Sequence, residues 1–162
     1  MRQLTLLLLR HAEAEAARHG QPDIERPLTD HGRTEALDAA ECMAAAQLRI
    51  DTVLVSPALR TRETAIIVAA ELDIAEELQF DPALYLGEPA ELLSPLQRCP
   101  DSVQTVLMVG HNPGLSALAQ QFMGGKQRID MRPAGLCRID FEHLAWRQVR
   151  QDVAVSFAVL RY

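Results

Sequence analysis

Two histidines and two arginines each follow a short hydrophobic segment of this chain. Arg10 and His11 follow the first segment, Arg60 follows the second after a Ser-Pro pair, and His111 follows the third after a glycine. A neutral imidazole can attack phosphorus and carry the phosphoryl group as a covalent intermediate. Arginine forks bind phosphoryl oxygens and stabilise the charge that spreads over them in the transition state. Brought together, these four side chains can transfer a phosphoryl group without a metal.

The three hydrophobic segments are predicted strands, because each is short, apolar nearly throughout and ended by polar residues. They are residues 3–9 (QLTLLLL), 52–55 (TVLV) and 104–109 (QTVLMV). Helical patterns alternate with these strands, which predicts a three-layer α/β/α fold with a mainly parallel central sheet. In such sheets the ligand crevice lies beyond the carboxyl ends of the strands, so the polar turns should converge there.

Three sequence signals predict where helices begin. Thr29 is a predicted N-cap for a helix over 29–48, and Ser56 chiefly caps a helix that runs through 58–72. Pro113 marks the start of a third helix. Helix N-termini favour anions, so the second and third starts strengthen the prediction of a phosphate site. Elsewhere we expect a short strand over residues 78–80 and a short helix, weakened by a proline, over 88–98. The end of the chain is expected to be β-rich, over 135–141 and 152–160.

Composition narrows the function classes. The chain has 162 residues, which predicts a single domain over residues 1–162. A net charge of −6 argues against a nucleic-acid binder. The three cysteines lack the spacing of a zinc site or a disulfide framework, and we expect neither a metal nor another cofactor. No segment is long and apolar enough to span a membrane, and no cleavage site follows the first apolar run, so we expect a cytoplasmic protein without membrane contact.

Four motifs in order resemble those of a known family. LLLRHAEAE, RPLTDHGRTEA, VLVSPALRTRETA and LMVGHNPGLSALA are similar to the signature segments of the histidine phosphatase superfamily, also called phosphoglycerate-mutase-like. The resemblance covers about residues 4–122 and is strongest to SixA-type phosphohistidine phosphatases. It implies that His11 is the phosphorylated nucleophile and that Arg10 and Arg60 bind the phosphoryl oxygens. It also implies that His111 donates to the phosphoryl group, with a protonated resting state as one option, and that the backbone N–H of Asn112 adds a donor.

The chain departs from the family pattern at two positions. Mutase-like members carry an asparagine six residues after the nucleophile, where this chain has Ala17, and a glutamate general acid, where it has Leu86. Glu88 and Asp81 are nearby but out of register. An alkoxide leaving group needs a proton in the transition state, whereas an imidazole has a conjugate acid of pKa near 6.5 and leaves with little help. The site therefore suits cleavage of a P–N bond.

Several polar residues have roles that the sequence leaves open. One of three carboxylates is expected to orient the pocket, and two arginines of the loop after the nucleophile are candidates for its rim. The remaining histidines are expected at the surface. The three carboxylates are Asp30, Glu35 and Glu63. The two arginines are Arg18 and Arg26. The remaining histidines are His19, His31 and His143.

Three functions remain in competition at this point. The first is a metal-independent phosphatase that acts on a phosphohistidine of a partner protein, such as a phosphotransfer domain or a phosphocarrier, through phospho-His11. The second is a small-molecule phosphomonoesterase of the same superfamily. The third is a non-catalytic phosphate-binding module, which the presence of all four candidate residues disfavours. The sequence does not indicate an oligomeric state.

Overall fold

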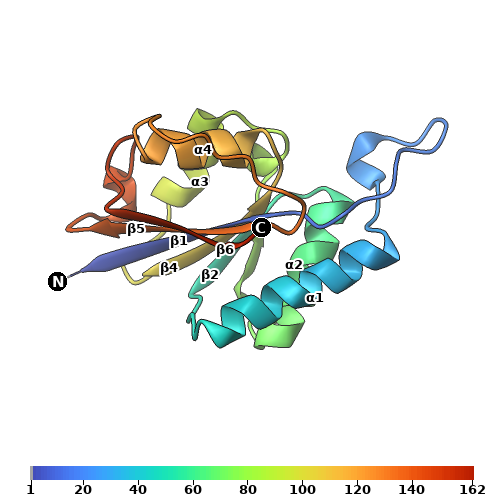
Figure 1. Ribbon diagram of the computed structural model, residues 1–162, viewed down its shortest axis with the longest axis horizontal. Helices are drawn as coiled ribbons and strands as arrows, with labels where there is room; N and C mark the ends of the chain where they lie inside the picture. Colours follow the sequence, from blue (N-terminus) through green and yellow to red (C-terminus); the bar gives the residue numbers. More distant parts are fainter. Residues whose placement is uncertain (1) are drawn as a thin grey trace.

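A computed structural model describes residues 2–162 as one six-stranded sheet with helices on both faces (Figure 1). The strands are β1 (Gln3–Arg10), β2 (Thr52–Val55), β3 (Leu78–Phe80), β4 (Thr105–Gly110), β5 (Leu136–Glu142) and β6 (Ser156–Arg161). The α-helices are α1 (Asp30–Ala45), α2 (Leu59–Leu72), α3 (Pro89–Gln97) and α4 (Gly114–Phe122). Short 3-10 helices are η1 (Asp23–Glu25), η2 (Ala75–Glu77), η3 (Pro82–Leu84) and η4 (Trp146–Gln148).

The sheet order is β3-β2-β4-β1-β5-β6, and its first four strands are parallel. The last two strands, β5 and β6, run antiparallel to their neighbours. Arg10 at the end of β1 pairs with Gly110 at the end of β4, and Val55 at the end of β2 pairs with Val109. The carboxyl ends of these three strands therefore lie side by side, which confirms the predicted mainly parallel α/β/α arrangement.

The position of β1 in the sheet explains why its sequence is apolar nearly throughout. Leu4, Leu6 and Leu8 pack into a core with α3 and α4, whereas Leu7 and Leu9 pack into a second core with α1 and α2. Figure 1 shows these helix pairs on opposite faces of the sheet. A central strand that is buried on both faces has no side on which polar residues are tolerated.

The starts of the helices agree with the sequence in one case and differ in another. Thr29 caps α1, since its hydroxyl accepts a hydrogen bond from the Gly32 amide at 2.9 Å. The prediction that Ser56 chiefly caps a helix is wrong. Helix α2 begins at Leu59 after Ala58, which provides no side-chain cap. The Ser56 hydroxyl bonds at 2.7 Å to His111, a partner far along the chain, and accepts only a long hydrogen bond of 3.4 Å from the Ala58 amide.

The loop between β1 and α1 projects beyond the end of the sheet (Figure 1). It contains η1 and is closed by an isolated bridge between Ala14 and Leu28. Because this loop leaves directly from the candidate nucleophile, its side chains can reach the same edge of the sheet.

Candidate active site

The five residues singled out from the sequence line one cavity at the carboxyl edge of the sheet. This cavity has a volume of about 380 Å³, and its lining includes Arg10, His11, Arg60, His111 and Asn112. The His11 amide donates to the Gly110 carbonyl at 3.0 Å, which extends the β1–β4 ladder into the site. The centres of the two histidine rings are 5.3 Å apart. The expected convergence of the three strand ends is present.

His11 is held as a neutral imidazole in one tautomer. Its Nδ1 atom lies 2.7 Å from the Ala12 carbonyl oxygen. A carbonyl only accepts, so Nδ1 carries the proton and Nε2 keeps its lone pair. Burial lowers the pKa of His11 from 6.5 to about 4, and the nearby charges of Arg60 and Arg10 act in the same direction. At neutral pH the ring therefore presents a nucleophilic nitrogen.

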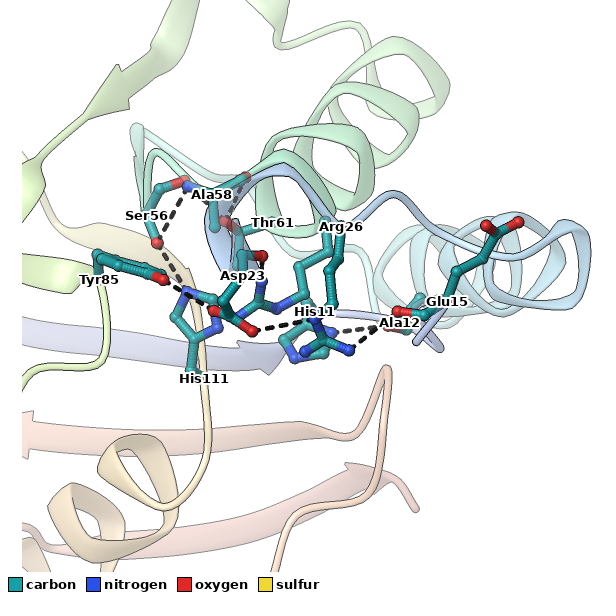
Figure 2. A network of polar contacts seen from close by, with 11 residues as sticks. His11, Ala12, Glu15, Asp23, Arg26, Ser56, Ala58, Thr61, Tyr85 and His111 are labelled. Atoms are coloured by element: carbon teal, nitrogen blue, oxygen red, sulfur yellow. Dashed lines mark hydrogen bonds and ion pairs between the residues drawn. The ribbon is translucent and has the colours of Figure 1, made fainter. Parts of the chain in front are cut away.

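His111 is also neutral, in contrast to the option of a protonated resting state. Burial, followed by the positive charge of Arg60, lowers the pKa of His111 from 6.5 to about 3. Its Nε2 atom forms a hydrogen bond of 2.7 Å with the Ser56 hydroxyl, as Figure 2 shows. The Thr61 hydroxyl donates to the Ser56 carbonyl at 2.8 Å and fixes this turn. Ser56 thus orients the second histidine.

The two arginines enter the cavity from different elements. Arg10 is the last residue of β1, and its Nη1 atom donates to the Met131 carbonyl at 2.9 Å. Burial lowers the pKa of Arg10, against the opposing influence of Asp130 and Glu35. Arg60 lies in the first turn of α2 with only 2% of its side chain exposed. Both guanidinium groups are consequently fixed in place with little freedom to move.

Three buried side-chain nitrogens in residues 2–162 lack a hydrogen-bond partner, and all three belong to this cavity. They are Nε of Arg10, Nε of Arg60 and Nδ1 of His111. A buried polar atom without a partner costs about 1–3 kcal/mol, so natural proteins leave few of them. Three such atoms in residues that line one cavity favour a site for a ligand that is rich in acceptors. A phosphoryl group, with its oxygens spread in several directions, meets this requirement.

Asp23, Arg26 and Tyr85 complete the site; Arg26 was expected at its rim, whereas Asp23 and Tyr85 were missed in the sequence. The Asp23 carboxylate accepts from Arg60 Nη2 at 3.0 Å, from Tyr85 OH at 2.7 Å and from Arg26 Nε at 3.0 Å (Figure 2). Its backbone carbonyl also accepts from Arg60 Nη1 at 2.8 Å. The hydrogen bond from Tyr85, and then that from Arg60, lowers the pKa of Asp23 to about 2. The carboxylate is therefore ionised and ties the projecting loop to α2.

None of the carboxylates proposed from the sequence orients the cavity. Glu35 accepts from the Glu13 amide, Glu63 accepts from the Leu28 amide, and Asp30 pairs with Arg33 at the surface. They brace the loop from outside. Of the two arginines considered for the rim, Arg26 lines the cavity, whereas Arg18 lies outside it with 80% of its side chain exposed. His19, His31 and His143 are exposed, as expected.

The Asn112 side chain supports the wall of the cavity. Its Nδ2 atom donates to the Met131 carbonyl at 2.8 Å, and its Oδ1 atom accepts from the Ser116 hydroxyl at 2.8 Å. Both ends of the amide are thus committed to the protein. Any contribution of Asn112 to a ligand comes from its backbone.

The segment around η3 and the start of α3 contributes an apolar side chain to the cavity lining and no carboxylate. Leu86 lines the cavity with 55% of its surface exposed, in a left-handed backbone conformation with φ of 51°. Glu88 caps α3, and Asp81 pairs with Arg98 at 2.6 Å. Neither carboxylate lines the cavity.

Two further properties of the described chain concern metals and membranes. Residues 2–162 contain no group of three or more His, Cys, Asp or Glu side chains placed to hold a metal ion. In the same residues, no helix is both long and apolar enough to cross a bilayer.

Comparison with known proteins assigns the family. Residues 6–85 match the histidine phosphatase superfamily (branch 1). An uncharacterised protein of Mycobacterium tuberculosis is 36% identical over 111 residues, which cover 68% of this chain and 67% of that protein. A structure from Agrobacterium tumefaciens, assigned as a phosphohistidine phosphatase SixA, has 26% identity and a TM-score of 0.79, with 96% of this chain and 97% of that chain covered. A protein histidine phosphatase SixA complexed with tungstate shares the fold, with 21% identity, a TM-score of 0.82 and 97% of each chain covered. This chain belongs to the histidine phosphatase superfamily and has the SixA-like fold.

Proposed function

We propose that this phosphatase removes the phosphoryl group from a phosphohistidine of a partner protein, through an intermediate on His11 and without a metal. The convergence of Arg10, Arg60 and His111 on the cavity that also holds the fixed Nε2 lone pair of His11 carries this proposal, and each of the three has a buried nitrogen without a protein partner. Cationic groups held in a buried site stabilise a transferring phosphoryl group without rearranging during the reaction.

The reaction has two steps. In the first, Nε2 of His11 attacks phosphorus and the P–N bond of the substrate breaks; the electron pair stays on the substrate nitrogen, and the ring leaves as neutral imidazole because its other nitrogen carries a proton. In the second, water attacks the phosphorus of phospho-His11, which releases inorganic phosphate and restores the neutral ring. During both steps Arg10 and Arg60 bind the phosphoryl oxygens. His111 assists when Ser56 donates to its Nε2 atom, because Nδ1 then carries the proton and donates to the phosphoryl group.

The leaving group favours phosphohistidine over an alkyl phosphate. The carboxylates that were candidates for a general acid lie outside the cavity lining, Glu88 exposed at the N-cap position of α3 and Asp81 paired with Arg98. Two carboxylates line the cavity: Asp23 is ionised at neutral pH, and Glu13 accepts a hydrogen bond from the Thr29 hydroxyl at 2.7 Å. An imidazole leaves without a strong acid, whereas an alkoxide loses the factor of about 10²–10⁴ that general-acid catalysis supplies. A phosphotransfer domain or a phosphocarrier in the cytoplasm would provide such a substrate.

A paired hydrolysis assay tests the proposal. Phosphoramidate and a phosphohistidine peptide are compared with an alkyl phosphate at matched concentrations, with and without a chelator. The acid-labile phosphoenzyme is trapped in the wild type, in His11→Asn and in His143→Asn, an exposed histidine that serves as the control.

We expect hydrolysis of both P–N substrates to exceed that of the alkyl phosphate by on the order of 10²-fold. The label should appear in the wild type and in His143→Asn, and be absent from His11→Asn. Preference for the alkyl phosphate would identify a small-molecule phosphomonoesterase instead. Loss of the rate on chelation, with rescue by a divalent metal, would overturn the metal-free mechanism.

A further inference from the structure

A basic segment runs beside the catalytic cavity between α4 and β5. It includes Arg128 and Arg132, both exposed, with Asp130 between them. Within residues 2–162, neither arginine has a carboxylate within ion-pair distance. Most other arginines of this acidic chain are paired, so these two guanidinium groups stand out as available to a partner.

The two arginines frame a second cavity, of about 250 Å³, together with Arg161 from β6. In Figure 1 the orange segment after α4 passes close to the end of β6. The apolar part of this cavity is formed by Ile129, Met131, Cys137, Phe157 and Val159. A cavity with an apolar interior and a charged rim has the composition of a protein-docking pocket, in which one apolar side chain enters and charged groups surround it.

A third hollow, here called the groove, shares lining residues with both cavities. The groove is lined by Arg10 and Asn112 of the active site at one end and by Arg128 and Ile129 of the basic segment at the other. The Met131 carbonyl accepts hydrogen bonds from both Arg10 and Asn112. The basic segment is therefore fixed directly to the catalytic residues and lies next to the site where a substrate would bind.

The charged groups around the second cavity favour an acidic partner. The chain carries a net charge of −6, which repels acidic molecules in general, but Arg128 and Arg132 outnumber Asp130 around this cavity, while Arg161 is paired with Asp38 at 3.5 Å. Local charge of opposite sign steers a partner to one orientation and accelerates its association. The apolar interior fits an aliphatic or aromatic side chain better than a nucleic-acid backbone.

We propose that the cavity framed by Arg128, Arg132 and Arg161 docks an acidic segment of the protein substrate, next to its phosphohistidine, with an apolar side chain of that segment entering the cavity. This inference rests on the proposed function and adds a specificity site to it. Arg128 and Arg132 contact carboxylates of the partner, and the catalytic residues contact only the phosphoryl group.

Three probes separate docking from chemistry. The first is phosphoramidate, which is too small to reach the second cavity. The others are synthetic phosphohistidine peptides of equal length, one with glutamate and leucine around the phosphohistidine and one with glutamine and leucine. They are assayed in about 0.15 M salt with the wild type, with Arg128→Glu/Arg132→Glu, and with Arg49→Glu/Arg150→Glu. The last variant changes two exposed arginines outside both cavities and has the same net charge.

We expect KM for the acidic peptide to rise about tenfold in Arg128→Glu/Arg132→Glu, with kcat and the phosphoramidate rate within about twofold of wild type. The neutral peptide should be affected by less than about twofold, and the control variant should resemble wild type. The unphosphorylated acidic peptide should compete with the acidic substrate for the wild type.

Three outcomes would overturn the docking site while leaving the proposed function intact. They are equal KM values for the two peptides in the wild type, an equal rise of KM in the control variant, and competition by an RNA oligonucleotide that matches the acidic peptide. A wild-type enzyme that leaves phosphoramidate and both phosphopeptides intact would instead overturn the proposed function. Binding of the unphosphorylated acidic peptide would still test the surface in that case.

Discussion

Acidification from pH 7.5 to 5.0 should lower the free energy of unfolding by about 4 kcal/mol through His11 and His111. In the unfolded chain each ring has a pKa near 6.5, whereas burial lowers the folded values to about 4 and about 3. As the pH falls below 6.5, the two rings bind protons in the unfolded state but stay neutral in the folded state, which favours unfolding. Stability is therefore greatest above pH 6.5 and is lost toward the folded pKa values. At pH 5.0 each ring has crossed about 1.5 pH units of this window, at about 1.4 kcal/mol per unit, which gives about 2 kcal/mol each.

Urea unfolding followed by Trp146 fluorescence measures this loss, because the only tryptophan of the chain is fully buried. His11→Gln and His111→Gln should each lose about 2 kcal/mol less than wild type between the two pH values. The exposed His143→Asn control should lose as much as wild type. If both buried-histidine variants lose the same free energy as wild type, the rings are not held neutral by the fold. The argument for a neutral nucleophile would then fail as well.

Three other substitutions test the contacts around the cavity. Asp23→Asn should lower kcat about tenfold because Arg60 loses a charged partner worth about 1.5–3 kcal/mol; steady-state assays of a double-mutant cycle should show that the loss shrinks in an Arg60→Ala background, and full additivity would contradict the coupling. Leu86→Glu should raise hydrolysis of an alkyl phosphate relative to phosphoramidate by about tenfold or more, because it adds a carboxyl group at the mouth of the cavity; an unchanged ratio of the two rates would show that a missing acid is not what limits ester cleavage. Gly32→Ala should lower stability by about 1–3 kcal/mol in thermal unfolding, since its Cβ would overlap the Glu13 carbonyl oxygen; a Tm equal to wild type would mean that the loop yields without strain.

The sequence was sufficient for residues whose position follows from a single strand. Arg10, His11 and His111 end or follow runs that are apolar because both faces are buried, so their convergence could be predicted. Asp23 could not, because it lies in an irregular loop and its partners Arg60 and Tyr85 come from other parts of the chain.

Ser56 shows how a local rule can mislead. A Ser-Pro pair ahead of a helix has the residue types of an N-cap, and only the folded chain reveals that the hydroxyl has a stronger partner in His111. The carboxylates Glu35 and Glu63 illustrate the same limit, since their sequence positions do not distinguish a pocket-facing group from one that braces a loop. In each case the deciding contact joins residues more than twenty positions apart.

Because Arg10 pairs with Gly110, the spacing of strands β1 and β4 sets the separation of the two histidines that follow them. Neighbouring strands lie about 4.8 Å apart, and the rings of the two histidines that follow β1 and β4 have centres separated by 5.3 Å. The gap between nucleophile and second histidine is thus inherited from backbone spacing, which no side-chain substitution elsewhere can readily change. Loops that recognise the rest of a substrate can differ without altering the spacing of the two histidines, so the same catalytic residues can serve different partners.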